Sequence, residues 1–537
     1  MTAAAAAGAP SVDLARSTVA MTAITLLSRL TGFVRILVVA AVLGTTFLGN
    51  TYQSANTIPN LLFELFAAGV LQAVLIPSLV ELLDQGDEAE AQHVTGSVLG
   101  LAGAGLAVLA GIGALAAPWV MRVLVSGVAS PEVREAQIRL GTILLWFFLP
   151  QVVLYAAGMV ATGVLNARGR FSLPVFAPAV NNVVVTASYG LFWYLRDGAS
   201  PSLDLTGAQI LVLGGGTTLG VLAFCAVPVI AVVRSGFSLR PRFDFRHPEV
   251  RRIARLGVWA AFLLAGTQVL MAVVLVLSNR VEGGVVAYQV AFTFFLLPHA
   301  LFALPVLTAL FPMLARHTST GDDAAFSRAV GSGVRVIAYL VLPATAFFVA
   351  MAGPLSDAFL FGEITGDGAR QVAGSVAAFA PGLLGYGAFL FLARAFYARG
   401  DTRTPALVGA AVVVGGAVMM VASFNLVPDD ARVPALAGAH SVAYLAGSVA
   451  IFVLLRRRVP VGSPGPVVSS LAAGVASAAL AGAAMVAAAT VVEVGGRPGA
   501  LLTLAFAGSV GLVVYVGAQA VVGRTPPRAV ADMMRGR

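Results

Sequence analysis

The sequence predicts an all-α polytopic membrane protein with about 14 transmembrane helices, arranged as two six-helix lobes in parallel repeat plus two C-terminal helices. Three observations support this fold class. The 537 residues are 59% hydrophobic and 11% charged, with a mean hydropathy of +0.92, whereas soluble domains are about 25% charged. Apolar runs of membrane-spanning length follow one another along the chain. The first six of these runs are repeated in the next six.

The spans themselves are the first element of the prediction. A helix that crosses the hydrocarbon core needs about 20 mostly apolar residues. Runs of this kind are separated by charged residues, glycine or proline. The fourteen predicted spans are 18–44, 50–83, 93–121, 136–164, 172–195, 206–233, 253–279, 284–314, 329–353, 370–397, 404–427, 433–455, 463–491 and 498–522.

An internal repeat relates the first six spans to the next six. Residues 77–97 and 312–332 share a proline, a Gly-Asp pair, an alanine and a Gly-Ser pair at a shift of 235. A second block repeats at a shift of 231, with Pro150, Tyr155, Arg168, Gly169 and Pro174 matched by Pro381, Tyr386, Arg399, Gly400 and Pro405. An even number of spans gives both copies the same orientation, an arrangement typical of secondary transporters.

The repeat predicts three parts of the chain. They are an N-lobe over residues 1–235 with spans 1 to 6, a C-lobe over 236–460 with spans 7 to 12, and residues 461–537 with spans 13 and 14 and a tail. All 33 basic residues are arginines, and they concentrate in the even-numbered links and the C-terminal tail. The positive-inside rule therefore predicts a multi-pass protein of the cytoplasmic membrane with both termini in the cytoplasm.

The link between the predicted lobes has two interpretations. Residues 237–255 alternate arginine with phenylalanine, leucine and isoleucine. One interpretation is an interfacial segment lying on the anionic cytoplasmic leaflet. The other is a plain basic linker.

Two arginines remain inside the first predicted span. A charged side chain at the bilayer centre costs about 3 kcal/mol, so such residues usually face a cavity. Arg29 and Arg35 are six residues apart, about 9 Å of helix rise, and Gly32 permits a bend that turns both toward one chamber. Guanidinium groups donate paired hydrogen bonds to phosphate oxygens, which favours a phosphate or pyrophosphate ligand. The alternative is that one arginine snorkels to an interface.

The second predicted span contains a carboxylate, Glu64, among apolar neighbours. It either forms a structural ion pair with Arg29 or Arg35 or binds a proton during transport. Pro59 loosens this helix, which suits a moving element. The remaining polar residues of the spans are interpreted as hydrogen-bond partners between helices. They are Asn181, Asn182, Gln268, His299 and His440.

Several function classes find no support in the sequence. It contains no nucleotide-binding Gly-rich loop with its lysine and no metal-binding His/Glu helix, and its single cysteine, Cys225, lies in an apolar run. We therefore expect no enzyme activity, cofactor or metal. The net charge of +9 follows from arginines in short membrane loops, so we expect no nucleic-acid partner.

Three local sequences resemble the MurJ/MviN family of lipid II flippases, within the larger superfamily of multidrug and polysaccharide–lipid exporters. Ser28 to Arg35 (SRLTGFVR) resembles the first-helix signature, Ile58 to Leu62 (IPNLL) the second-helix signature, and Ala398 to Pro405 (ARGDTRTP) the loop before span 11. The resemblance covers nearly the whole chain. It implies that the substrate is undecaprenyl-pyrophosphate carrying the peptidoglycan disaccharide-pentapeptide, held by the two first-span arginines.

The chain departs from the family pattern at several positions. Asn50 stands where the family commonly has an acidic residue, and Phe63 and Glu64 stand where basic residues are usual. Residues 287–295 of span 8 read AYQVAFTFF, without the family's arginine, and spans 7, 11 and 12 lack the carboxylates that form a sodium site in some members. The predicted substrate-binding residues are Arg29, Arg35, Asn50, Asn60 and Glu64.

Together these observations predict a flippase that moves a lipid-linked peptidoglycan precursor across the cytoplasmic membrane by alternating access. Its expected partners are the undecaprenyl-pyrophosphate-linked substrate and membrane lipids, with cell-wall synthesis proteins as further candidates. Two alternatives stay open. One is an exporter of another lipid-linked glycan or an amphiphilic drug, with Glu64 as the key residue. The other is a non-transporting scaffold for cell-wall assembly.

Overall fold

The computed structural model describes residues 10–66, 75–244, 246–248, 250–252, 268–459, 465–492 and 494–522. Within these ranges the regular structure is helical, without strands. Eleven helices are long and apolar enough to cross a membrane, or twelve when the bent pair Gly366–Phe379 and Gly382–Ala398 counts as one span. The predicted all-α membrane fold is confirmed. The count of fourteen is not, because predicted spans 50–83 and 253–279 include residues outside the described ranges.

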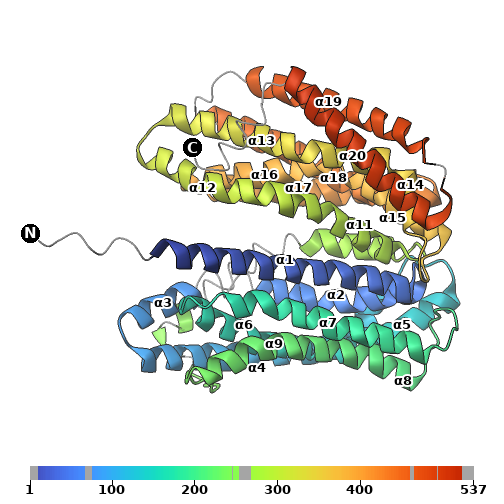
Figure 1. The fold of residues 1–537 in the computed structure, drawn as a ribbon. Coiled ribbons are helices and arrows are strands. Elements are labelled where there is room, and N and C mark those ends of the chain that lie inside the picture. Colours follow the sequence, from blue (N-terminus) through green and yellow to red (C-terminus); the bar gives the residue numbers. More distant parts are fainter. Residues whose placement is uncertain are drawn as a thin grey trace, which may run out of the picture. The chain divides into compact units, whose positions relative to one another are not determined.

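The chain forms two compact units, Met1–Gln268 and Val269–Arg537. In each, the long helices lie side by side (Figure 1). Unit 1 contains α1 (Pro10–Leu43), α2 (Phe47–Phe66), α3 (Ile76–Asp84), α4 (Glu88–Leu124), α5 (Pro131–Phe148), α6 (Gln151–Ala167), α7 (Ser172–Leu195), α8 (Gly207–Ile210), the π-helix η2 (Leu211–Gly215) and α9 (Gly216–Arg234).

A short apolar helix, Gln268–Ser278, leads into unit 2. The further elements of unit 2 are α11 (Gly284–Pro298), the π-helix η3 (His299–Ala303), α12 (Leu304–Ser319), α13 (Asp323–Ala350), α14 (Ala352–Ala358), α15 (Gly366–Phe379), α16 (Gly382–Ala398), α17 (Arg403–Leu426), the 3-10 helix η4 (Asp429–Ala431), α18 (Arg432–Arg458), α19 (Gly465–Ala489) and α20 (Gly496–Val522).

A proline interrupts the fourth predicted span of each unit. Pro150 is the N-cap of α6 and Pro381 is the N-cap of α16, with φ of −58° and −60°. Proline has no N–H to continue the ladder of the preceding helix, so the helix ends there. In unit 2 the helices on either side of the break are bent by 45°. Pro150 and Pro381 therefore mark the ends of helices at matching points of the repeat.

The repeated Gly-Asp pairs form the same turn in both units. Gly86 and Gly321 have φ of +77° and +68°, a conformation that glycine adopts without steric strain. The following aspartates, Asp87 and Asp322, cap α4 and α13. Each carboxylate accepts the backbone N–H three residues on, at 2.9 Å and 2.8 Å respectively. The sequence repeat is therefore also a repeat of local structure.

An arginine reaches the start of the capped helix in each unit. Arg168 pairs with Glu88, and Arg399 pairs with Asp323 at 2.7 Å. The Arg168 guanidinium also lies 4.9 Å from the ring centre of Phe237. These contacts tie the end of the fourth span to the start of the third.

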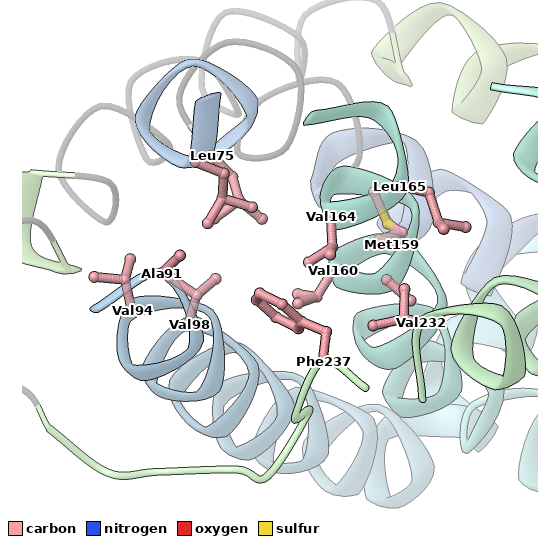
Figure 2. Packing of buried hydrophobic residues seen from close by; sticks show 12 residues of the cluster. Leu75, Ala91, Val94, Val98, Met159, Val160, Val164, Leu165, Val232 and Phe237 are labelled. Atoms are coloured by element: carbon pink, nitrogen blue, oxygen red, sulfur yellow. The ribbon is translucent and has the colours of Figure 1, made fainter. Parts of the chain in front are cut away.

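The segment that follows α9 is held against α4 and α6 within unit 1. Phe237 is 2% exposed and lies with Val232 among apolar side chains of α4 and α6 (Figure 2). A little further on, the Arg242 N–H donates to the Gly96 carbonyl at 2.9 Å. The described part of the link between the predicted lobes is therefore packed on protein, and both interpretations of its composition stay predictions. Residues 245, 249 and 253–255 lie outside the described ranges.

Two glycines of α4 permit this close approach. A β-carbon at Gly96 would lie 2.4 Å from the Arg240 carbonyl oxygen, and one at Gly100 would lie 2.0 Å from that of Arg242. Neither distance is sterically tolerable, and backbone atoms cannot rotate out of the way as side-chain atoms can. The segment therefore crosses α4 only because these positions lack side chains.

Replacing Gly100 with alanine should lower the free energy of unfolding by about 1–3 kcal/mol, the usual cost of overpacking. The matched control is Gly103→Ala on the same helix, where a β-carbon meets nothing within 4 Å. That variant should be unchanged or slightly more stable, since alanine favours a helix over glycine by about 1 kcal/mol. Thermal unfolding of the purified proteins in detergent compares them. Equal melting temperatures for the two variants would contradict the close approach.

Candidate functional site

The two predicted arginines of α1 have different surroundings. Arg29 is exposed, whereas Arg35 is partly buried. Helix α1 is continuous through Gly32, without a break in its backbone hydrogen bonding there. Gly32 allows α7 to come close, because a β-carbon there would lie 3.3 Å from Asn182 Nδ2. That amide donates to Thr31 Oγ1 at 3.2 Å, which joins the two helices.

Arg35 lies among tyrosines in the interior of unit 1. Its charge interacts with Tyr52 on α2, Tyr155 on α6 and Tyr189 on α7, each no more than 5% exposed. The Arg35 Nε is buried and has no hydrogen-bond partner within the described chain. Nor does any described carboxylate form an ion pair with Arg35. Within the described ranges, the guanidinium therefore has phenol groups near it and no carboxylate paired with it.

The tyrosines continue into a chain of hydroxyl groups. The Tyr52 hydroxyl lies 2.9 Å from that of Tyr189 and 2.6 Å from Thr217 Oγ1. Thr217 donates its only proton to the Leu213 carbonyl at 2.6 Å, so it must accept from Tyr52. Tyr52 must then accept from Tyr189. This order leaves lone pairs of the Tyr189 oxygen free for Arg35, with which Tyr189 also has a hydrogen-bonding interaction.

Helix α2 brings a second predicted residue to the same tyrosines. The Tyr155 hydroxyl donates to Asn60 Oδ1 at 3.0 Å, and the Asn60 amide donates to the Asn56 carbonyl at 2.9 Å. The ring of Phe63 packs on Tyr155 with 4.2 Å between centroids. Asn60 thus contacts Tyr155, and the charge of Arg35 acts on the same tyrosine, so these two predicted residues share a neighbour.

The other two predicted residues of α2 lie elsewhere. Glu64 is exposed and accepts a hydrogen bond from Gln268 Nε2 at 3.0 Å. Between Glu64 and the α1 arginines, no ion pair occurs in the described structure. Asn50 is completely buried near the start of α2, and its N–H donates to the Thr46 carbonyl. The tyrosines around Arg35 were not predicted, since tyrosine does not interrupt an apolar run.

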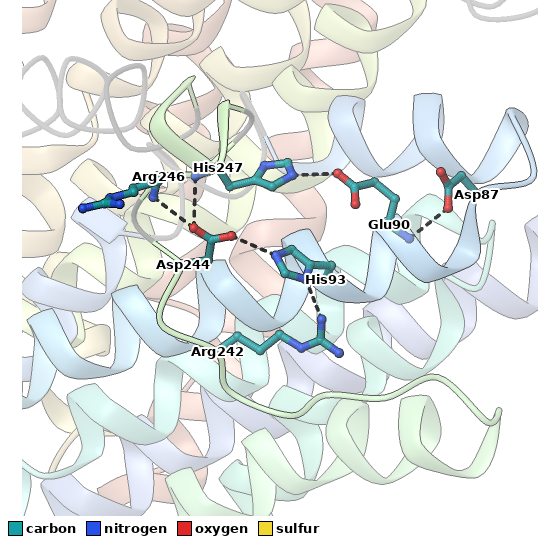
Figure 3. A network of polar contacts seen from close by, with 7 residues as sticks. All are labelled: Asp87, Glu90, His93, Arg242, Asp244, Arg246 and His247. Atoms are coloured by element: carbon teal, nitrogen blue, oxygen red, sulfur yellow. Dashed lines mark hydrogen bonds and ion pairs between the residues drawn. The ribbon is translucent and has the colours of Figure 1, made fainter.

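A second polar network holds the segment after α9 to the start of α4 (Figure 3). His93 Nε2 lies 3.1 Å from Asp244 Oδ2, and His247 Nε2 lies 2.7 Å from Glu90 Oε1. The two imidazole rings are 5.4 Å apart. Asp244 Oδ1 also accepts the N–H of Arg246 at 3.0 Å. The same carboxylate therefore fixes the backbone of its own segment and binds His93 of α4.

The network defines the tautomer of His93. Arg242 hydrogen-bonds to His93 Nδ1, and a guanidinium can only donate. Nδ1 is therefore the acceptor, and the ring carries its proton on Nε2, which it donates to Asp244. This hydrogen bond, with those of the backbone, holds the pKa of Asp244 below its usual value. The described residues contain no group of three or more metal-binding side chains here or elsewhere.

We expect Asp244→Asn to loosen the segment of residues 237–244. Asparagine keeps an oxygen for the backbone N–H groups but loses the charge that faces His93. Hydrogen exchange should become faster in this segment. Asp204→Asn, in an exposed loop of the same unit, is the control and should leave the segment unchanged. Identical exchange in both variants would show that the aspartate does not anchor the segment.

Sequence comparisons identify relatives along most of the chain. The family model of the lipid II flippase MurJ matches residues 39–506. The probable lipid II flippase MurJ of Vibrio cholerae is 26% identical over 417 residues, which covers 76% of this chain and 77% of the relative. The lipid II flippase MurJ of Burkholderia cenocepacia is 28% identical over 432 residues, with coverages of 78% and 79%.

Solved structures share the fold at low sequence identity. A lipid II flippase MurJ in an inward closed conformation superposes with a TM-score of 0.74 at 16% identity, covering 94% of this chain and 98% of the other. An inward-facing multidrug resistance transporter of the MATE family gives a TM-score of 0.66 at 12% identity, with coverages of 82% and 97%. Both belong to proteins with this helical architecture, and the likeness shows the fold.

Proposed function

Because the chain belongs to the family of the lipid II flippase MurJ, we propose that it carries lipid II across the cytoplasmic membrane by alternating access. It is a multi-pass membrane transporter and not an enzyme. Its substrate is an undecaprenyl-pyrophosphate-linked peptidoglycan precursor, and membrane lipids surround it. Cell-wall synthesis proteins stay candidate partners.

The observation that carries the site assignment is the charge of Arg35. A cation inside a membrane helix is costly unless it is paired, and the groups around Arg35 are neutral phenols. Phenol oxygens orient the guanidinium but do not cancel its charge. A pyrophosphate does both, because its oxygens accept the paired N–H groups of an arginine. Arg35 is therefore the principal ligand of the substrate pyrophosphate.

Arg29 acts at a different point along the route of the pyrophosphate across the membrane. Six residues of an α-helix turn through about 600°, so the two side chains point about 120° apart, and they are about 9 Å apart along the axis. Arg29 is exposed where Arg35 is partly buried. We assign Arg29 to the first contact with the pyrophosphate. Asn60 is assigned to the surroundings of the pyrophosphate when Arg35 holds it. Asn50 stays a prediction.

The orientation of the chain is part of the same proposal. The arginine-rich links and the C-terminal tail face the cytoplasm under the positive-inside rule, which puts both termini on that side. The division into an N-lobe of residues 1–235, a C-lobe of 236–460 and a C-terminal part of 461–537 also stays a prediction.

Arg35→Ala should abolish rescue of a bacterium depleted of its own lipid II flippase. Each charge-assisted hydrogen bond contributes about 1.5–3 kcal/mol, so losing two or more should slow transport over tenfold. Arg35→Lys should rescue in part, because the ammonium keeps the charge but lacks the planar fork. The exposed Arg139→Ala in α5 should rescue like the wild type. Full rescue by Arg35→Ala at equal membrane expression would refute the assignment.

Glu64→Gln separates this proposal from export of a cationic amphiphile. Glutamine keeps the length of the side chain and an oxygen for the hydrogen bond from Gln268 while removing the charge. Lipid II transport relies on the arginines, so rescue by Glu64→Gln should fall less than rescue by Arg35→Ala. Loss of activity in Glu64→Gln with activity kept in Arg29→Ala and Arg35→Ala would favour the cationic substrate instead.

A further inference from the structure

The internal repeat provides unit 2 with a counterpart of the tyrosine beside Arg35. Tyr155 and Tyr386 each follow the repeated proline by five residues, on α6 and α16. In unit 1, Tyr155 contacts the second span through Asn60 and the sixth through Phe224, 6.3 Å between centroids. The second and sixth spans of the chain correspond to the eighth and twelfth in the repeat. The matching location in unit 2 is therefore where spans 8 and 12 meet Tyr386.

At that location unit 2 carries histidines. Tyr386 lies 4.7 Å from the ring of His299, which begins η3 after α11, and 6.3 Å from that of His440 on α18. His299, on the eighth span, stands where unit 1 has Asn60 on the second span, and His440, on the twelfth, stands where unit 1 has Phe224 on the sixth. An imidazole is the side chain that gains or loses a charge near neutral pH without a large perturbation.

His440 is enclosed by aromatic rings. It is 5% exposed, and its Nδ1 has no hydrogen-bond partner in the described structure. The rings around it come from α11, α15, α16 and α18. Their centroids lie at 4.7 Å for Tyr444, 5.3 Å for Phe379, 5.5 Å for Phe295, 5.8 Å for Phe292 and 6.3 Å for Tyr386.

Among the described residues, no ion pair or hydrogen bond joins His440 to a charged side chain. The other titratable groups of the cluster are His299, Tyr288, Tyr386 and Tyr444. The charged residues on the described elements that form or flank the cluster are Asp367, Arg370, Arg394, Arg432, Arg456, Arg457 and Arg458, with Asp323, Arg328, Arg335 and Arg403 on α13 and α17. On α18 the nearest in sequence is Arg432, eight residues or about 12 Å from His440.

The rings around His440 lie on both sides of an irregular point in the helices. Phe379 ends α15 and Tyr386 follows on α16, across the 45° break at Pro381. Ser441, next to His440, donates to the Ala378 carbonyl at 2.7 Å just before that break. A change of charge or hydration at His440 therefore acts on contacts that span the bend.

We propose that His440 is a proton-binding site through which a proton gradient drives the transport cycle; this rests on the function proposed above. The imidazole takes a proton from water on its free ring nitrogen and becomes a cation. In the observed packing that cation has aromatic rings but no anion beside it, and burial of such a charge is costly. Protonation therefore favours a conformation in which the bend opens and water reaches the ring.

The same linkage couples the proton to the substrate. A ligand shifts an equilibrium between two conformations only by binding them differently, and the coupling is reciprocal. If protonated His440 prefers one conformation of unit 2 and lipid II prefers another, release of the proton and binding of the substrate alternate. No carboxylate is needed for this exchange.

Transport of fluorescent lipid II in proteoliposomes tests the proposal. The membrane potential is clamped with valinomycin, and a pH gradient is imposed or collapsed with nigericin. The wild type should flip lipid II several-fold faster with the gradient than without it. His440→Phe, which keeps an aromatic ring but cannot bind a proton, and His440→Gln should both reduce that ratio to about one, as loss of a linked proton site requires.

The remaining histidines are the controls. His299→Gln, His317→Gln, His93→Gln and His247→Gln should keep the gradient stimulation. If both His440 variants fail to fold, the test is made on the wild type. Adding lipid II to weakly buffered protein should release protons, and the absence of proton release contradicts the proposal. Unchanged stimulation in His440→Phe overturns it, as does a wild type that flips lipid II without stimulation. A wild type that flips no lipid II under any gradient overturns the proposed function instead.

Discussion

An arginine held inside an apolar helical unit without a carboxylate beside it is the constraint on which the rest of the site depends. Hydrocarbon penalises such a charge, so the protein must orient and hydrate it or leave it for a ligand. Around Arg35, three helices supply phenol groups, and the hydroxyl chain through Tyr189 and Tyr52 ends on a backbone carbonyl of the π-helix η2. Every proton in that chain points away from the arginine, so its charge stays available.

The two units use one architecture for different chemistry. Both have the Gly-Asp turn, the capped helix, the arginine that reaches it and the proline that breaks the fourth predicted span. The repeated tyrosine has different charged neighbours in the two units: Tyr155 is near Arg35 of the first span, whereas Tyr386 is near His440 of the twelfth, which is not the counterpart of Arg35 in the repeat. A permanent cation suits an anionic ligand, and a titratable ring suits a proton. The duplicated frame thus accounts for both proposals.

The sequence predicted much of the fold because membrane helices follow directly from apolar length. Twelve of the predicted spans coincide with helices, and the repeated prolines lie at helix breaks. Arg29 and Arg35 were found because charge is rare in such runs. The contact between Gly32 and Asn182 was not predicted, because it depends on how α1 and α7 pack. The tyrosines escaped prediction, since their hydrogen bonds join residues 137 and 165 positions apart and depend on tertiary packing.

The most direct test of the account is equilibrium binding of undecaprenyl pyrophosphate to the purified protein in detergent, with undecaprenol as the ligand that lacks phosphate. The account predicts that Arg35→Ala weakens pyrophosphate binding at least tenfold, about 1.4 kcal/mol, and leaves undecaprenol binding unchanged. Equal affinity of wild type and variant for the pyrophosphate would contradict the assignment of Arg35 as its ligand.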